Sequence, residues 1–201
     1  VYKRQLHMLL NKDPQSEKLR RTQAIANLLF QFCGMPFSDL AHLEKSNLER
    51  GLLKYNRTKT GTPMSIEVLE SAQNAIGGLY NKSDARSSGY PDYLFRILSG
   101  AYKRNEEGAY REYQSALRRF NNELKSLSRK LRLHSPVTSY TLRHSWATTA
   151  KYRGVPIEMI SESLGHKSIK TTQIYLKGFE LEERTKVNKL NYSYVCNFKM
   201  L

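Results

Sequence analysis

The sequence predicts a mainly α-helical α+β domain with one small antiparallel sheet. Apolar side chains recur at steps of three and four residues in several stretches, which is the spacing of amphipathic helices. One pair of short runs, residues 51–57 and 64–68, reads as strands on either side of a turn that contains glycine and proline. Glycine or proline ends most of the helical stretches, so we expect several short helices.

The first part of the chain is predicted to form two helices. A short apolar run at 6–10 precedes residues 17–32, where apolar residues share one helical face. These residues are Leu19, Ala24, Ile25, Leu28, Leu29 and Phe32. A second helix is expected to start at Phe37, with Ser38 or Asp39 as its N-cap.

The predicted hairpin spans residues 51–68 and places Lys59 at or beside its tip. A lysine at such a tip is either solvated or free to reach into a groove. A weaker helix is expected over 70–80. Residues 81–91, rich in serine, glycine and aspartate, are expected to form a loop.

Residues 109–133 form the strongest predicted helix. Its apolar stripe is expected to pack in the core and consists of Tyr110, Tyr113, Leu117, Phe120, Leu124, Leu127 and Leu131. Its other faces carry many arginines and lysines. A solvated face and a DNA-facing surface are equal alternatives for these charges.

Three short helices are predicted to follow: one from about residue 139 to Lys151 or Arg153, one over 156–164 and one over 168–176. Ser139 or Thr141 is the expected cap of the first of them, and Ser168 that of the last. Residues 180–190 are charged and helix-prone, whereas 191–201 form a tail with no clear period.

The composition favours a polyanionic partner. The chain of 201 residues has the length of one domain, and its net charge is +15 with a pI of about 9.8. A basic surface that serves only solubility is the alternative. The sequence contains no apolar run long enough to span a membrane and no secretory signal peptide. Cys33 and Cys196 suggest neither a disulfide nor a metal site, so an intracellular, reducing compartment is expected.

Arg143, His166 and Tyr175 follow in order near the C-terminus, at gaps of 23 and 9 residues. An arginine fork can hold two phosphate oxygens, a histidine can donate or move a proton, and a tyrosine phenol can be a nucleophile. Together they could attack a phosphodiester. The ordinary alternatives are a surface ion pair, a locally bonded turn histidine and a core tyrosine.

The residues around this triple resemble the catalytic signature of the tyrosine recombinases, the phage integrase family. The signature motifs are Leu142-Arg143-His144-Ser145-Trp146-Ala147-Thr148, Leu164-Gly165-His166 and Thr172-Gln173-Ile174-Tyr175. Upstream, Phe32-Cys33-Gly34-Met35-Pro36-Phe37-Ser38-Asp39-Leu40 is similar to the family's first block, and Arg57-Thr58-Lys59-Thr60-Gly61 to its hairpin-lysine motif. The motifs are most similar to those of integrases from Bacteroidetes mobile elements.

The resemblance implies a catalytic domain over residues 6–190 and a reaction. Tyr175 would attack a DNA phosphodiester, form a 3′-phosphotyrosyl bond and free a 5′-hydroxyl, which later reverses the step. Arg143 would clamp the phosphate, His166 would donate to it or assist proton transfer, and Lys59 would protonate the 5′-oxygen. Neither a cofactor nor a metal is needed.

The same resemblance implies site-specific integration, excision or inversion of double-stranded DNA by a tetramer on paired sites. The protein is then expected in the bacterial cytoplasm, associated with the nucleoid and not with a membrane. Residues 180–190 would dock on a neighbouring protomer or, as an equal alternative, pack on their own domain.

Two positions depart from the family pattern. Tyr140 stands where a histidine is usual, and Cys33 and Pro36 stand where the first catalytic arginine is expected. Either another basic residue such as Arg57 supplies the missing charge, or this copy is impaired. A recombinase remnant, or a helix-turn-helix DNA-binding protein without strand cleavage, is therefore the alternative function.

The ends of the chain carry two further expectations. Residues 1–5, Val-Tyr-Lys-Arg-Gln, are what one frame of a common sequencing adaptor encodes, so they are expected to be non-native. The family places a helical DNA-binding domain before the catalytic one, and that domain is expected to be missing here.

Overall fold

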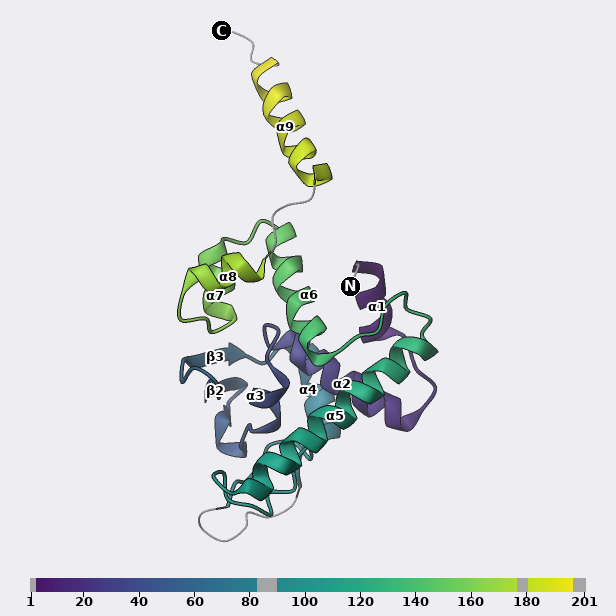
Figure 1. Ribbon diagram of the computed structural model, residues 1–201, viewed down its shortest axis with the longest axis vertical. Helices are drawn as coiled ribbons and strands as arrows, with labels where there is room; N and C mark the ends of the chain where they lie inside the picture. Colours follow the sequence, from purple (N-terminus) through teal and green to yellow (C-terminus); the bar gives the residue numbers. More distant parts are fainter. Residues whose placement is uncertain (1–2, 83–89, 177–180, 197–201) are drawn as a thin grey trace.

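The computed structural model describes residues 3–82, 90–176 and 181–196. Within these ranges the chain is mainly helical and has one three-stranded antiparallel sheet, so the predicted fold class is confirmed (Figure 1). Residues 83–89, the middle of the expected loop, lie outside the described residues.

The N-terminal helices are α1 (Lys3–Asn11), α2 (Glu17–Gln31) and α3 (Phe37–Ala41). The apolar run at 6–10 is part of α1, and Leu9 is fully buried. Gln23 of α2 donates from its side chain to the carbonyls of Leu9 and Lys12, both at 2.8 Å. These bonds satisfy carbonyls at the end of α1 and hold it against α2. Gln5, from the adaptor-like segment, is buried in α1.

The sheet has the order β1-β2-β3, with β1 (Leu48–Glu49), β2 (Leu52–Asn56) and β3 (Pro63–Glu67). The predicted hairpin is β2 and β3, and Leu53 opposite Ile66 gives it one buried face. A short 3-10 helix, η1 (Lys45–Asn47), precedes β1. The strand β1 was not predicted, because two residues are too short to show alternation.

Helices α4 (Glu70–Leu79) and α5 (Glu107–Lys130) cover α2. The apolar stripe of α5 packs in the core as predicted, with one exception. Tyr110, on the first turn of α5, is 64% exposed.

The C-terminal helices are α6 (Ser139–Tyr152), α7 (Ile157–Ser163), α8 (Ile169–Tyr175) and α9 (Leu181–Cys196). The predicted cap of α6 was wrong: Thr138 caps it, in a reciprocal box with Thr141. Ser168 caps α8 as predicted. Helix α9 continues past residue 190, where the helix-prone segment was expected to end, and extends away from the rest of the described chain (Figure 1).

Two hydrophobic clusters meet along α6. The large one is built from α1 to α6 and includes Leu142, whereas the small one contains Ala147, Ile160, Leu164 and Leu176. Buried polar residues gather at the seam between them. The candidate site lies at this seam.

Candidate active site

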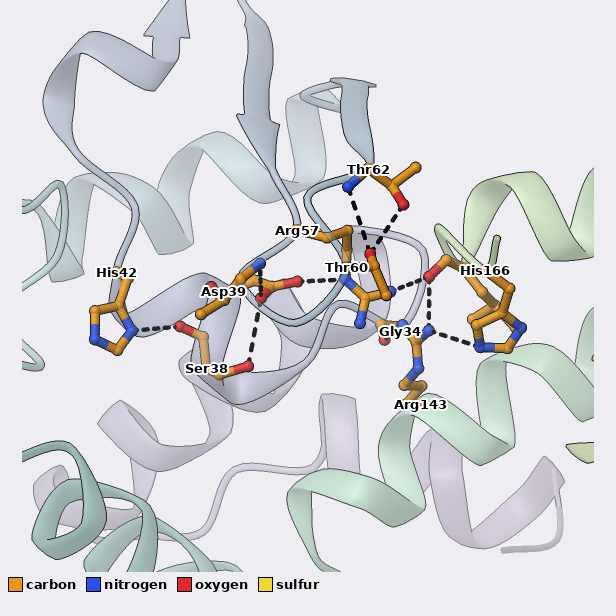
Figure 2. A network of polar contacts seen from close by, with 11 residues as sticks. Gly34, Ser38, Asp39, His42, Arg57, Thr60, Thr62, Arg143 and His166 are labelled. Atoms are coloured by element: carbon orange, nitrogen blue, oxygen red, sulfur yellow. Dashed lines mark hydrogen bonds and ion pairs between the residues drawn. The ribbon is translucent and has the colours of Figure 1, made fainter. Parts of the chain in front are cut away.

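Arg143 lies at the centre of the seam. Its side chain projects from α6, is 8% exposed and donates from Nη1 to the Gly34 carbonyl at 2.9 Å (Figure 2). Its Nη2 donates to the Leu164 carbonyl at 2.7 Å and lies 3.2 Å from His166 Nε2. The alternative of a surface ion pair is therefore wrong for Arg143.

Arg57 enters the same place from the end of β2. It is 7% exposed, its Nε lies 2.7 Å from Asp39 Oδ2, and its Nη1 also donates to the Leu164 carbonyl. Asp39 accepts a further bond from the Thr58 backbone N–H at 3.1 Å. The expectation that Asp39 caps α3 was wrong: Pro36 is the N-cap, and the Asp39 carboxylate turns toward Arg57.

Two buried guanidinium groups therefore face one carboxylate. Burial, followed by the nearby charge of Arg57, lowers the pKa of Arg143 to about 10, so Arg143 is still protonated at neutral pH. Asp39 balances one of the two positive charges. An uncompensated buried charge is costly unless a partner arrives, so this arrangement favours binding of an anion.

His166 is neutral and engaged at both ring nitrogens. Its Nδ1 lies 2.8 Å from Thr172 Oγ1, and Nε2 faces Arg143. Because an arginine can only donate, Nε2 accepts and Nδ1 carries the proton. Burial, and then the charges of Arg143 and Arg57, lower the pKa of His166 to about 4.

Tyr175 is the last residue of α8, and three aromatic rings surround it. The ring centroids of His144, Tyr140 and His166 lie 5.0, 5.8 and 6.0 Å from that of Tyr175, all edge to face. The Tyr175 hydroxyl is buried, and burial raises the pKa of its phenol. The phenol therefore keeps its proton at neutral pH, and a nucleophilic role requires a group that removes it.

Tyr140 and Lys59 are less enclosed than these residues. Tyr140 packs one edge against Tyr175 but is 64% exposed. Lys59 is exposed in the turn between β2 and β3, two residues after Arg57. Bonds of Arg57 N–H to the Thr62 carbonyl and of Gly61 N–H to the Arg57 carbonyl shape this turn, at 2.9 and 2.8 Å.

The first-block positions carry no charge into the site. Cys33 is half-buried, and burial raises the pKa of its thiol, so it stays neutral. Pro36 begins α3. Between them, Gly34 presents its carbonyl to Arg143. Arg57 is thus the residue that brings a second positive charge next to Arg143.

Three members of the site were not predicted from the sequence: Asp39 and the carbonyls of Gly34 and Leu164. Asp39 read as a helix cap, and the Gly34 and Leu164 carbonyls have no side-chain signal at all. The one available signal for Asp39 was an acidic residue close in sequence to the expected arginine position.

Other kinds of site find no support in the described part of the chain. No group of three histidine, cysteine or carboxylate side chains there could hold a metal ion. None of its helices is long and apolar enough to cross a bilayer.

The chain is similar to known proteins in both sequence and fold. The model of the phage integrase family matches residues 1–181. A probable integrase/recombinase protein of Methanocaldococcus jannaschii is 30% identical over 185 residues, which are 89% of this chain and 52% of that protein. The chain therefore spans about half the length of this relative.

Two solved structures share the fold. The crystal structure of XerA recombinase superposes with a TM-score of 0.65 at 23% identity, over 94% of this chain and 62% of that one. The Tn1549 transposon integrase in complex with transposon right end DNA gives a TM-score of 0.65 at 15% identity, over 95% and 65%.

Proposed function

The chain belongs to the phage integrase family, and from this premise we propose that it is the catalytic part of a tyrosine-type site-specific DNA recombinase. One observation supports this function above the others: two buried arginines with a single carboxylate lie beside a ring-packed tyrosine. A phosphodiester supplies the anion that the arginines lack and the electrophile that the tyrosine needs.

In the proposed reaction the Tyr175 oxygen attacks the phosphorus of one DNA strand. The Oη–P bond forms, the P–O5′ bond breaks, and the 5′-oxygen leaves with the bonding electrons and takes a proton from Lys59. Arg143 holds the non-bridging oxygens, where charge increases in the transition state. His166 stays neutral and orients Arg143 through its Nε2. The freed 5′-hydroxyl of a partner strand reverses the step.

Arg57 serves in this proposal as the second phosphate clamp. The family's first arginine is absent from Cys33 and Pro36, yet the Arg57 guanidinium meets Arg143 at the shared Leu164 carbonyl. Asp39 holds Arg57 through its Nε and the Leu164 carbonyl accepts from its Nη1, so Nη2 is the nitrogen that would donate to a phosphate oxygen. The positive charge of Arg57 therefore favours an active recombinase over a catalytically impaired remnant.

The proposed substrate is double-stranded DNA, and the proposed assembly is a tetramer on paired sites. The net charge of +15 favours a polyanion. The described side chains of α9 between 184 and 193 are all exposed, which supports docking of this helix on a neighbouring protomer rather than on its own domain. Work on chromosomal DNA would place the protein at the bacterial nucleoid. The expectations for residues 1–5 and for a missing upstream domain stay predictions.

Covalent capture tests the function without knowledge of the target sequence. The chain is incubated with a pool of random-sequence duplexes that carry a nick, so that a cleaved strand end diffuses away and the adduct accumulates. We expect a protein–DNA adduct that survives denaturation and disappears in Tyr175→Phe. Absence of an adduct, or its persistence in Tyr175→Phe, would reject the proposal.

The same captured duplexes separate an active enzyme from a remnant. The double variant Arg57→Gln/Asp39→Asn removes the second clamp without leaving Asp39 buried and unpaired. Loss of one preorganised donor typically costs about a hundred- to a thousandfold in rate, which is the expected decrease. In a remnant the unchanged chain would be inactive, and Pro36→Arg or Cys33→Arg would create cleavage.

A further inference from the structure

We propose that His144 is the residue that accepts the Tyr175 proton during strand cleavage, in place of the histidine that Tyr140 replaces. This inference rests on the proposed function and extends it to a residue of α6 that has no assigned role. Two observations support it. The His144 ring packs against the Tyr175 ring, and both ring nitrogens of His166, the other histidine at Tyr175, already have partners.

His144 lies next to the nucleophile because of helical spacing. Residues four apart share one face of a helix, so Tyr140 and His144 both face α8. The two are not equivalent, since Tyr140 is 64% exposed and His144 is half-buried one turn further in. Of the three rings around Tyr175, His144 is the closest, with centroids 5.0 Å apart and an interplanar angle of 88°.

The other groups around Tyr175 are poorly suited to take its proton. His166 uses Nε2 for Arg143 and Nδ1 for Thr172, so accepting a proton would break its contact with the phosphate clamp. Arg143 has no acceptor atom, and the Tyr140 phenol is a weak base at neutral pH. An imidazole is a suitable base there, because in its neutral form one ring nitrogen can accept a proton.

Among the residues that the structure describes, the charged and titratable groups at this place come from two sides. Helix α6 contributes Tyr140 and Arg143, and the turn before α8 contributes His166. The Arg143 charge stabilises the phenolate as it forms, because it lowers the pKa of Tyr175 against the effect of burial. A base is still needed, since burial dominates that pKa.

The proposed step balances as follows. The Tyr175 O–H bond breaks toward an imidazole nitrogen of His144 while the Oη–P bond forms. The P–O5′ bond breaks, and the 5′-oxygen receives a proton from Lys59. His144 ends as an imidazolium and returns its proton to Tyr175 when the step reverses. Catalytic hydrogen bonds often tighten only once substrate is bound, so the ring contact marks the partner and not the final geometry.

The test measures the single-turnover rate of adduct formation on the captured nicked duplex, for the 201-residue chain and its variants. General base catalysis is typically worth about a hundredfold or more, so His144→Gln and His144→Ala should lose at least that at neutral pH. The deficit should shrink as the pH rises, because the small fraction of phenolate that forms without a base increases with pH. Added imidazole should restore part of the rate of His144→Ala.

A matched histidine exchange controls for general effects. His134→Gln, at an exposed position beyond α5, should cleave at the rate of the unchanged chain at every pH. Urea unfolding of each variant verifies that it is folded. The inference is overturned if His144→Gln cleaves normally, or if its deficit is the same at all pH values and imidazole does not restore it. A chain that forms no Tyr175-dependent adduct at all overturns the proposed function, and this inference with it.

Discussion

At the scale of single residues, the site consists of charged side chains that are almost completely buried. Arg57 and Arg143 are 7% and 8% exposed, and Asp39 is 2% exposed. Buried charges of this kind are rarely retained for stability, because desolvation offsets most of the attraction between them. Their value lies in preorganisation: Arg57 and Arg143 both donate to the Leu164 carbonyl, so the two guanidinium groups are already held side by side before an anion binds.

The neutral state of His166 makes stability depend on pH in a defined direction. The folded chain binds fewer protons than the unfolded chain between the pKa of about 4 and the ordinary value of about 6.5. The His166 contribution is therefore complete above the upper value and is lost as the pH falls toward the lower one. Urea unfolding over this range should show a smaller pH dependence in His166→Gln than in the unchanged chain. Equal pH dependence in both would contradict the prediction.

At the scale of elements, glycine allows the turn between α2 and α3 to approach α6 closely at the site. Gly34, in the turn between α2 and α3, has a φ of +65°, and an added Cβ would lie 3.1 Å from Trp146 Cβ and 3.2 Å from Arg143 Cα. Its carbonyl also accepts a bond from Arg143. The turn therefore sets how deeply α6 sits and where the Arg143 guanidinium points.

Two glycine-to-alanine variants separate backbone conformation from close packing. Gly154 also has a positive φ, of +76°, but an added Cβ there meets nothing within 4 Å. Overpacking typically costs about 1–3 kcal/mol, so Gly34→Ala should lose that much more stability in urea than Gly154→Ala. Because α6 must shift to admit the methyl group, Gly34→Ala should also slow adduct formation. Equal losses of stability in the two variants would contradict this account of Gly34.

At the scale of the whole molecule, part of the excess positive charge lies on the face of α5 that borders α6. Asn121 of α5 accepts a bond from the Ser139 N–H at the start of α6, so that face of α5 borders the helix that carries Arg143. Arg118 and Lys125 are three and four residues from Asn121 and share its face. We expect these two residues to contact DNA phosphates beside the site. This prediction favours a DNA-facing surface over a solvated face for the charges of α5.

The salt dependence of binding tests this orientation. Each phosphate contact contributes about 0.9 to the slope of log K against log salt, so Arg118→Gln/Lys125→Gln should reduce the slope by up to about 2. The control is Arg50→Gln, since Arg50 lies at the end of β2 opposite Arg57, and its side chain is 92% exposed. Binding to a random-sequence duplex is measured over a series of salt concentrations. The same slope in the double variant and the control would place DNA elsewhere.

The sequence predicted most of the fold because its signals are local. The stripe of α5, the hairpin with its glycine turn and the Ser168 cap depend on residues a few positions apart, so their spacing is visible in the chain. The cap of α6 was missed by a local error, since Thr138 caps it, but two other errors were decided by the tertiary structure. Tyr110 continues the apolar period of α5, but no neighbour in the described part of the chain covers it on the first turn of the helix and it is 64% exposed. Asp39 fits a cap by its place before a helix but pairs with Arg57, eighteen residues later.

For this protein the sequence by itself determined the family and the identity of Arg143, His166 and Tyr175 as candidate catalytic residues, because motif order and spacing survive without coordinates. Only the tertiary structure decided what surrounds them. It brought Arg57 to Arg143 through a shared carbonyl, made Asp39 its counter-charge, engaged both nitrogens of His166 and set His144 against the nucleophile. The reason is physical: burial, charge balance and hydrogen-bond direction depend on which elements pack together, and that information is spread over the whole chain.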